Sequence, residues 1–457
     1  MQAFLDSLLN VVVKVNGFLT DYVLIVLLVG VGLFYTIKTR FVQVRCFGEG
    51  MKKVFGNIKF RGGKQEGGIS SFQALATAIA AQVGTGNIVG ASGAILVGGP
   101  GAIFWMWIIA FFGMATIYAE AVLAQETRYV DENGEAHGGP VYYIKTAFKG
   151  TFGKFLAVFF SIAAILALGF MGAMVQSNSI AESVTNATGV EGWIVGLVVA
   201  AIAAFIFIGG IQRIASVTEK MVPIMACLFL LGGLIILAVN IKYIPATFAM
   251  IFKYAFTPSA IIGGTFGAAI KTAISQGAKR GLFSNEAGMG STPHAHAMAK
   301  VEKPHDQGVV AMIGVFIDTF VVLTMTALVV ISTLYAKNPD AWQSVSKTNA
   351  MQTAAGSVFG TDIGSIFVAI CLFFFAFSTI LSWNFFGKLN VESLFNNKKW
   401  ATVLYSVIAI VFIFLGSCLK NDLVWELTDF FNYLMVLPNV IALFALSKIV
   451  TKNSSKK

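Results

Sequence analysis

The sequence predicts an all-α polytopic membrane protein made of two inverted five-helix repeats, which supply ten core helices, plus one extra N-terminal helix. Three observations carry this prediction. Of the 457 residues, 57% are hydrophobic and only 12% are charged, whereas soluble domains carry about a quarter charged residues. Eleven apolar windows follow one another along the chain, and two of them are interrupted by glycine-rich polar segments. This composition excludes a water-soluble multidomain enzyme.

The apolar windows match the length needed to cross a bilayer, which is about 20 residues. Residues 1–15 are predicted to be an amphipathic approach to a retained first helix, because they lack the basic start and the cleavage site of a signal peptide. The predicted spans are residues 18–37, 70–98, 101–127, 153–184, 192–210, 215–240, 260–298, 308–334, 362–390, 400–417 and 423–449.

The distribution of Lys and Arg predicts the orientation of these spans. With the N-terminus outside, 25 Lys and Arg fall on the cytoplasmic side, six fall on the other side and Lys271 lies within a span. Cytoplasmic loops carry the basic excess in membrane proteins, so we expect the N-terminus outside and the C-terminus in the cytoplasm of a cell membrane. The net charge of +10 does not indicate nucleic-acid binding, because no basic run is interleaved with aromatic residues.

Two of the spans contain polar, glycine-rich segments: GTGNIVGASG at 84–93 and GAKRGLFSNEAGMGS at 277–291. Non-helical backbone at membrane depth is tolerated only where it lines a cavity or is buried in protein, so both breaks are candidate binding sites. With the first helix set aside, the broken spans are the first and sixth of ten, which predicts an inverted repeat. The predicted organisation is residues 1–69 for the extra helix and its loop, 70–240 for the first repeat and 241–457 for the second.

The first break carries three strongly polar side chains, Gln82, Thr85 and Asn87. A half-helix that begins near Asn87 presents its positive dipole end to an anion such as a carboxylate. Carbonyl groups at the end of the half-helix near Gln82 suit a cation such as Na⁺, and Gly86 lets the backbone approach a ligand. The alternative is a packing seam, because Gly86 and Gly90 are four residues apart.

Other polar and aromatic side chains extend this candidate site. Ser378 and Thr379, in the span 362–390, carry hydroxyl groups that are able to complete a cation shell, or that bond back to their own helix. Gln176 is an amide within the span 153–184 and needs a partner, which is either a substrate or another helix. Phe283 and Trp383 are candidates for the wall of an apolar pocket.

Charged residues within spans are few, and Lys271 and Asp318 lie in consecutive spans. We expect them to form a structural ion pair, with a proton relay as the alternative. The four cysteines are far apart and are assigned to helix packing rather than to a metal or a disulfide. The four histidines lie in or next to cytoplasmic connections and give no support to metal catalysis.

Three stretches resemble the signatures of the alanine or glycine:cation symporter family: AAQVGTGNIVGASGAILVGGPGAIFWMW at 80–107, HGGPVYYI at 137–144 and GLFSNEAGMGSTPHAHA at 281–297. The resemblance extends over essentially the whole chain. It implies a LeuT-type inverted-repeat core and import of small neutral amino acids coupled to Na⁺ or, in some members, H⁺.

The resemblance also implies roles for the candidate residues. The segment from Gln82 to Asn87 would bind the backbone groups of the substrate, and the coupling cation would lie between this break and the helix that carries the two hydroxyl residues. The full set implied for the substrate is Gln82, Thr85, Gly86, Asn87, Gln176, Phe283 and Trp383, and the set implied for the cation is Gln82, Ser378 and Thr379.

The predicted function is therefore secondary active symport of alanine or glycine by alternating access, driven by a Na⁺ gradient. Coupling to H⁺ is the alternative for the driving ion. A channel and a membrane-embedded enzyme are the alternative functions from other classes of membrane protein. The sequence contains no phosphate-binding loop and no GxSxG nucleophile motif. We expect no cofactor beyond the coupling ion, with an amino acid, a monovalent cation and the bilayer as partners and the oligomeric state open.

Overall fold

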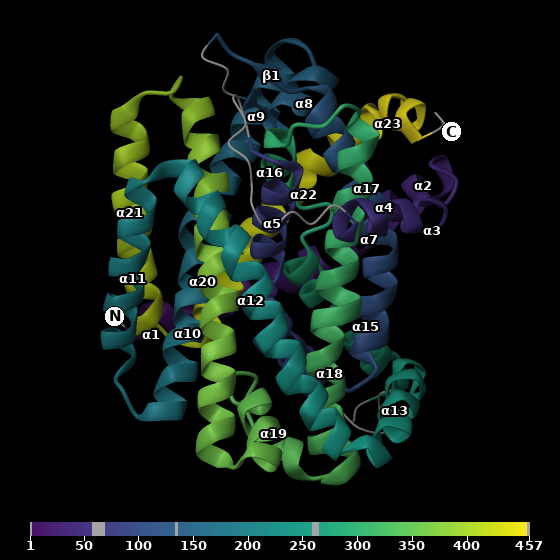
Figure 1. Ribbon diagram of the computed structural model, residues 1–457, viewed down its shortest axis with the longest axis vertical. Helices are drawn as coiled ribbons and strands as arrows, with labels where there is room; N and C mark the ends of the chain where they lie inside the picture. Colours follow the sequence, from purple (N-terminus) through teal and green to yellow (C-terminus); the bar gives the residue numbers. More distant parts are fainter. Residues whose placement is uncertain (1, 57–68, 133–135, 258–264, 455–457) are drawn as a thin grey trace.

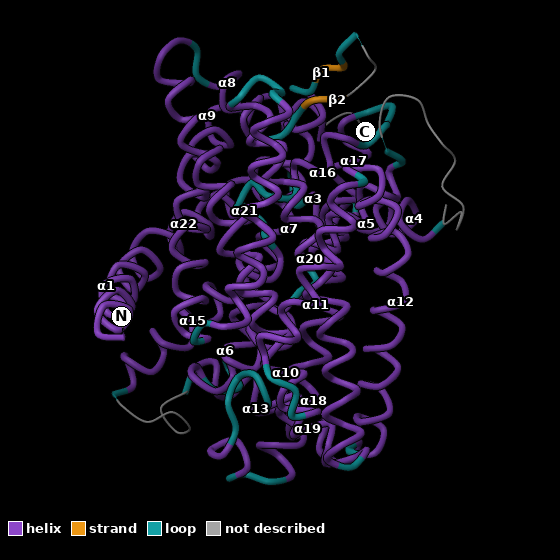
Figure 2. The backbone as a smooth tube through the Cα atoms, turned by 90° about the vertical axis from the view of Figure 1, so that its left-hand side faces the viewer, coloured by secondary structure: helices purple, strands orange, loops and turns teal. Residues whose placement is uncertain are grey.

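The computed structural model describes residues 2–56, 69–132, 136–257 and 265–454. It is almost wholly helical, and its two short strands lie at one end (Figure 2). We call this the β1 end, where α8 and α23 also lie, and we call the opposite end, with α13 and α19, the α19 end (Figure 1). Three of the basic residues predicted for the first cytoplasmic loop, Lys59, Arg61 and Lys64, lie outside the described residues.

The first half of the chain carries the N-terminal helix, the first break and the two strands. Its elements are α1 (Gln2–Phe18), η1 (Leu19–Leu24), α2 (Ile25–Lys38), α3 (Val42–Arg45), α4 (Phe47–Phe55), α5 (Ser71–Gln82), η2 (Gly86–Gly90), α6 (Ala91–Gly98), α7 (Ala102–Glu126), β1 (Tyr129–Val130), β2 (Ala136–His137), α8 (Pro140–Ala147), α9 (Gly150–Ala164), η3 (Ile165–Gly172), α10 (Ala173–Thr188), α11 (Gly192–Ile208) and α12 (Gly210–Val239). The two strands pair antiparallel, with Tyr129 opposite His137.

The second half carries the second break and the long helix with the two predicted hydroxyl ligands. Its elements are η4 (Ile241–Tyr243), α13 (Ile244–Phe256), α15 (Phe266–Asn285), α16 (Pro293–Met298), α17 (Pro304–Val315), η5 (Phe316–Leu323), α18 (Thr324–Ile331), η6 (Ser332–Lys337), η7 (Ala341–Ser344), α19 (Ala350–Phe359), α20 (Thr361–Leu394), α21 (Lys399–Cys418), α22 (Asn421–Ala445) and α23 (Ser447–Ser454).

Each of the eleven predicted spans contains helix among the described residues. Among the described residues, eight helices are individually long and apolar enough to cross a membrane, and the first of them runs from Leu5 to Lys38. A ninth span is the pair Ser71–Gln82 and Gly86–Gly98, which is bent by 44° at the first break. Gly192–Ile208 is a shorter apolar helix, and the remaining predicted span is divided between α15 and α16. The prediction of an all-α polytopic membrane protein is confirmed.

Local sequence explains where the broken helices begin and end. A capping box starts α5, because the Ser70 hydroxyl accepts from the Gln73 N–H while the Gln73 side chain accepts from the Ser70 N–H. The α5 helix stops at Val83, whose ψ of 86° cannot continue it. The α15 helix ends at Glu286, which has a left-handed φ of 59°, and Gly288 and Gly290 follow with φ of 88° and 80°. Glycine tolerates such angles without strain.

The two broken helices run side by side because their ends are joined. At the β1 end, Ile69 pairs with Ala299 in an isolated bridge, so the start of α5 meets the end of α16. Close to the breaks, small residues allow the aromatic side chains to pack against backbone; a Cβ at Gly86, for example, would lie 2.9 Å from the ring of Phe283. Such backbone-to-side-chain contact is the usual way in which helices associate in lipid.

Candidate functional site

The first break is held open by side chains that bond to its backbone. The Gly84 N–H donates to Asn87 Oδ1 at 2.9 Å, and the Thr85 N–H donates to Gln176 Oε1 at 3.0 Å. A helical turn therefore cannot form across these residues, since their N–H groups are bonded to side chains. Thr85 and Asn87 are fully buried, and Gln82 and Gln176 are nearly so. The structure thus brings the predicted amide of α10 onto the predicted break.

The two breaks are joined by side-chain hydrogen bonds. Gln82 Nε2 donates to the Asn285 carbonyl at 2.8 Å, so the last residue of α5 holds the last residue of α15. Asn87 Nδ2 donates to Asp318 Oδ1 at 2.6 Å, and Ser284 Oγ lies 3.0 Å from both carboxylate oxygens of Asp318. The buried carboxylate in η5 therefore contacts both broken helices.

Aromatic side chains cover the breaks on one side. The ring of Phe283 meets that of Trp383 edge-on, with centroids 5.8 Å apart, and it packs on Trp425 at 4.8 Å. Trp383 Nε1 donates to Glu286 Oε1 at 2.5 Å, which ties this wall to the second break. Phe283 and Trp383 thus lie together, as the prediction of a pocket wall requires, and Trp425 from α22 joins them.

The two hydroxyl residues of α20 face the end of α5. Thr379 Oγ1 lies 2.8 Å from the Ala80 carbonyl, 3.4 Å from the Ala81 carbonyl and 3.1 Å from the Phe375 carbonyl of its own helix. Ser378 Oγ lies 3.4 Å from the same Ala80 oxygen. Several oxygen atoms thus converge between α5 and α20, as a hard cation requires. Gln82, the third residue of the predicted cation set, instead directs its amide toward the second break.

Several buried polar atoms around the first break have no hydrogen-bond partner among the described residues. Thr85 Oγ1, Gln176 Nε2 and Gln82 Oε1 belong to this group. Leaving a buried polar group unbonded costs about 1–3 kcal/mol, so these three atoms are candidate contacts for a polar ligand.

Charged residues close the α19 end of this site. Lys279 Nζ lies 2.8 Å from Glu426 and 3.0 Å from Asp429, and Arg280 Nη1 lies 3.2 Å from Asp429. The Arg280 guanidinium also stacks on Trp425, at 4.6 Å from the ring centroid. Lys347, from the connection between α18 and α19, approaches the same ring at 5.4 Å. Burial, and then the charge of Arg280, lower the pKa of the Lys347 ammonium.

A carboxylate organises the irregular segment that follows the second break. Glu120, from α7, accepts from the Gly288 and Gly290 N–H groups at 3.0 Å each and from Asn439 Nδ2 at 2.6 Å. Ser291 donates to Glu286, whose other oxygen accepts from Trp383. The unwound segment is therefore fixed by side chains from three neighbouring helices.

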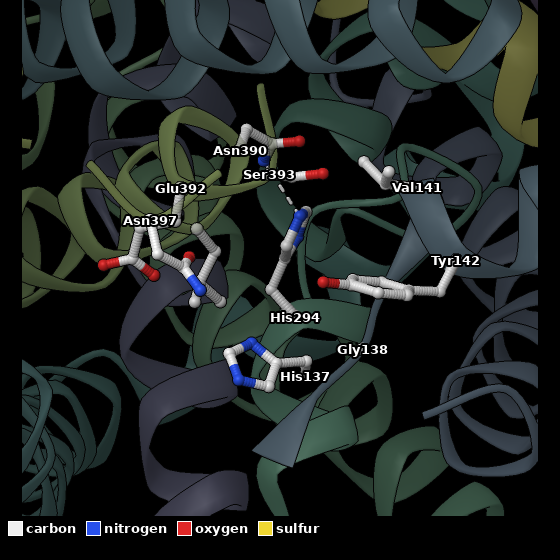
Figure 3. A pocket seen from close by; sticks show the side chains of 10 residues that line it. His137, Gly138, Val141, Tyr142, His294, Asn390, Glu392, Ser393 and Asn397 are labelled. Carbon is white, nitrogen blue, oxygen red and sulfur yellow. Dashed lines mark hydrogen bonds between the residues drawn. The ribbon is translucent and has the colours of Figure 1, made fainter. Parts of the chain in front are cut away.

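Two of the glycine-containing motifs meet at the β1 end. His294 follows the second break, and its ring contacts the Ser291 carbonyl at 2.7 Å and Asn390 Nδ2 at 2.9 Å (Figure 3). His137 and Gly138 line the same pocket (Figure 3). Gly139 has a φ of 110°, and a Cβ there would lie 3.2 Å from the His294 ring. The HGGP motif thus packs directly against the segment that leaves the second break.

The predicted ion pair between Lys271 and Asp318 is wrong. Lys271 lies on an exposed face of α15 and pairs with Asp21 of η1 at 2.7 Å. Asp318 is fully buried, and no described Lys or Arg forms an ion pair with it. Asp318 bonds to Ser284, which lies thirteen residues after Lys271 on α15, so the two residues are separated by about 20 Å along the helix axis.

The sequence reasoning missed the roles of several residues at the breaks. Ser284 lies within the recognised motif at 281–297, so the motif contained a signal for it. Trp425 is an ordinary residue of an apolar helix in the sequence, and Asp429 is one of the few charges within a predicted span, but only the fold brings them over the breaks. Glu120 is likewise a charge within the predicted span 101–127, but its contact with the second break comes from the packing of α7 on α16.

Comparisons with known proteins agree with this architecture. The model of the family described as "Sodium:alanine symporter family" matches residues 5–456. The sodium/alanine symporter AgcS of Methanococcus maripaludis is 43% identical over 98% of this chain and 96% of its own length. The putative sodium/proton-dependent alanine carrier protein YrbD of Bacillus subtilis is 39% identical over 96% of this chain and 90% of its own. The probable sodium/glutamine symporter GlnT of the same organism is 36% identical over 98% of this chain and 90% of its own.

A solved structure supports the fold. The crystal structure of MhsT in complex with L-phenylalanine superposes with a TM-score of 0.59, at 14% sequence identity, and the match covers 86% of this chain and 100% of that chain. At this identity the likeness bears on the fold alone, and it confirms the LeuT-type inverted-repeat architecture with its first and sixth core helices broken.

Proposed function

The chain belongs to the sodium:alanine symporter family, and we propose that it imports small neutral amino acids, with alanine and glycine as the expected substrates, driven by an inward Na⁺ gradient. Amino-acid:cation symport follows from the family, and it assigns the chain to transport rather than to catalysis. The choice of amino acid and of Na⁺ is the part that we propose.

The observation that carries the substrate proposal is the group of unpartnered atoms at the first break. Thr85 Oγ1 and Gln176 Nε2 are both able to donate to a carboxylate, and both are buried beside the backbone of the break. Phe283 and Trp383 form an apolar wall next to them. An amino acid offers a carboxylate for the first feature and a side chain for the second. The close contact between Gly86 and Phe283 leaves little room and favours a small side chain.

The cation proposal rests on the oxygen atoms between α5 and α20. We assign the coupling Na⁺ to the position where Thr379 and Ser378 meet the Ala80 and Ala81 carbonyls. These are neutral oxygen donors, which suit a hard monovalent cation at the end of a half-helix. Because the same half-helix leads into the break, a cation bound there would favour the conformation that receives the substrate, and the substrate would raise cation affinity by the same factor.

A second candidate for the coupling ion is H⁺, and Asp318 favours it. This buried carboxylate contacts both broken helices, so a change in its charge would act on both. The relative YrbD is named as a putative sodium/proton-dependent alanine carrier protein, and this name supports H⁺ as the alternative coupling ion.

For the orientation, we propose that the β1 end faces the cytoplasm of a cell membrane and that the α19 end faces outside. The basic excess predicted from the loops supports this assignment. In this orientation, the contacts of Lys279 and Arg280 with α22 close the outer path to the breaks.

The test is uptake of radiolabelled alanine into proteoliposomes that contain the purified protein. We expect an inward Na⁺ gradient to stimulate uptake and unlabelled glycine to compete more strongly than glutamine or phenylalanine. Stimulation by a pH gradient alone would replace Na⁺ by H⁺ in the proposal. Saturable uptake that responds to neither gradient would contradict coupled symport, and competition by large amino acids alone would contradict the small pocket.

A further inference from the structure

A cluster of metal-binding side chains lies outside the site described above, and we propose that Cys46, Glu49 and His305 bind a divalent cation of the zinc type. The cluster joins the segment after the N-terminal helix to the start of α17. It shares no residue with the breaks, so the proposal does not depend on the transport function. The sequence analysis assigned the cysteines to helix packing, because Cys46 and His305 are far apart along the chain and only the fold brings them together.

The three ligand atoms are already close to a binding arrangement. The thiol sulfur of Cys46, a carboxylate oxygen of Glu49 and a ring nitrogen of His305 all lie within 4.8 Å of one another. His305 Nε2 and Glu49 Oε1 are 3.6 Å apart. Tetrahedral zinc with bonds of about 2.0–2.3 Å separates its ligand atoms by about 3.3–3.8 Å. Small side-chain rotations would therefore suffice to close the set around one ion.

The backbone fixes the two ligands that come from the N-terminal region. Cys46 is the N-cap residue of α4 and Glu49 lies three positions later, so both project from one face of the helix. The α4 helix packs very closely on α17: a Cβ at Gly50 would lie 2.7 Å from Ile313 Cγ1 and 2.8 Å from the Val309 carbonyl. Glycine at position 50 thus allows the approach that brings the ligands of α4 to His305.

A partner on the other ring nitrogen orients His305. The hydroxyl of Tyr118, a fully buried residue of α7, lies 2.7 Å from His305 Nδ1. Metal-binding histidines almost always use their second nitrogen in such a contact, which fixes the ring and the tautomer. With Nδ1 facing Tyr118, Nε2 faces Glu49 and is the atom available to the ion.

A cavity beside the cluster and an excess of acidic side chains in its lining complete the site. The cavity beside the cluster has a volume of about 270 Å³, which is ample for water to supply a fourth ligand. Its lining carries more acidic than basic side chains, and this excess attracts a cation. The charged residues described in the lining are Arg45, Glu49, Glu126, Glu302, Lys303 and Asp306.

The ligand types select the ion. Sulfur and imidazole nitrogen favour Zn²⁺ over Mg²⁺, Ca²⁺ or the monovalent transport cation, all of which prefer oxygen. Binding would release the thiol proton of Cys46 to solvent, and the affinity would fall as the pH is lowered. The bound ion would connect α4 to α17 and so stabilise the attachment of the N-terminal segment to the core.

The experiment titrates the purified full-length protein with Co²⁺, which reports a thiolate ligand through its charge-transfer absorption, and then displaces Co²⁺ with Zn²⁺. We expect one equivalent to bind and the absorption to disappear in Cys46→Ser and in His305→Gln. The matched control is the double variant Cys227→Ser, Cys418→Ser, which removes the two exposed cysteines and leaves Cys46 in place. It should bind as the unchanged protein does.

A conservative variant keeps the proposal testable if the ligand variants fail to fold. Tyr118→Phe removes only the hydroxyl that faces His305, and the loss of such a partner typically weakens metal binding about 10–100-fold. Zn²⁺ should also raise the thermal unfolding temperature of the unchanged protein and not that of Cys46→Ser. Absence of the thiolate absorption in the unchanged protein, its persistence in Cys46→Ser, or its loss in the double control would each overturn the proposal.

Discussion

Two polar residues at the breaks are suited to different tasks. Thr379 presents a neutral hydroxyl among the Ala80 and Ala81 carbonyls, whereas Asp318 is an ionisable group bonded to Asn87 and Ser284. A neutral oxygen set binds Na⁺ without any change of protonation, and a buried carboxylate is a natural carrier of H⁺. The two coupling schemes therefore predict different sensitive residues.

Replacing Thr379 by Val removes the hydroxyl and keeps the shape of the side chain. If Na⁺ binds between α5 and α20, the half-saturating Na⁺ concentration for alanine uptake should rise about tenfold or more, since the loss of one good ligand costs about 1.4 kcal/mol or more. Alanine affinity at saturating Na⁺ should change much less. Uptake into proteoliposomes over a range of Na⁺ concentrations measures both quantities.

The matched control is Thr326→Val, which changes a buried threonine of α18 away from the breaks. Its Na⁺ dependence should stay normal.

Asp318→Asn tests the alternative scheme: loss of the pH dependence of uptake with unchanged Na⁺ dependence would favour H⁺. An unchanged Na⁺ requirement in Thr379→Val would exclude the assigned cation position.

At this scale, the sequence identified the polar residues that lie at the breaks better than it identified the contacts between residues. Polar side chains such as Gln82 and Gln176 stand out in apolar spans, and they do lie together at the first break. The partner of Asp318 was predicted wrongly, because the predicted span 260–298 contains the second break and depth cannot be counted along it as along one straight helix. Lys271 lies near the start of α15, whereas Asp318 bonds to Ser284 near its end.

At the level of elements, the second break depends on a helix that is remote in sequence. The segment after α15 has left-handed residues at Glu286, Gly288 and Gly290, and the N–H groups of the two glycines donate to a side chain instead of to a helical carbonyl. Glu120 of α7 supplies these acceptors, and Asn439 Nδ2 of α22 donates to Glu120 and to the Gly288 carbonyl. An unwound segment in a membrane is stable only when its backbone groups are satisfied in this way.

Replacing Glu120 by Gln should therefore destabilise the second break. One carboxylate oxygen becomes an NH₂ group, which must face the Gly288 N–H, the Gly290 N–H or the Asn439 amide, all of which are donors. Hydrogen bonds to a charged group contribute about 1.5–3 kcal/mol each, so the unfolding temperature in detergent should fall by about 5 °C or more. Transport should fall with it.

The control for this variant is Glu191→Gln, which changes an exposed glutamate at the N-cap of α11. It should leave both the unfolding temperature and uptake unchanged. Wild-type stability in Glu120→Gln would mean that the contacts of the carboxylate with the glycine N–H groups do not hold the segment.

The elements themselves were largely predictable, because hydropathy and glycine content are local properties of the sequence. Both breaks fall within the predicted spans, at Val83 and at Glu286. The first predicted helix begins too late, since helix continues from Gln2 through η1 into α2. The sequence there contains polar residues such as Asn16, which bonds to Glu426 of α22. A tertiary contact of this kind allows helix where hydropathy alone predicts none.

For the molecule as a whole, the inverted repeat places two half-helices from opposite directions at one site, and the proposed symport requires access to alternate between the two ends. At the α19 end, Lys279 and Arg280 of α15 pair with Glu426 and Asp429 of α22. At the β1 end, the HGGP motif packs on His294 (Figure 3). The division of the chain at residues 70 and 241 into two repeats stays a prediction.

The ion pairs at the α19 end must break when the site opens to that side. Weakening them is therefore expected to raise the population of the form that is open to the α19 end. Asp429 is nearly fully buried and pairs with Lys279 and Arg280, so Asp429→Asn removes two of the three ion pairs that hold α15 to α22 in the closed form and leaves the pair of Lys279 with Glu426. The open form should gain about tenfold in population for each 1.4 kcal/mol of lost closure energy.

Modification of a cysteine introduced on the path measures this shift. Ser92→Cys, a buried position on α6 between the first break and the α19 end, is placed in a chain whose exposed Cys227 and Cys418 are changed to Ser. A membrane-impermeant thiol reagent should react about tenfold faster after Asp429→Asn. Asp6→Asn, which affects an exposed pair with Lys420, should leave the rate unchanged, because such pairs contribute little. An equal rate in Asp429→Asn and its parent would mean that these ion pairs do not control access, and that the aromatic layer of Phe283 and Trp425 alone closes the path.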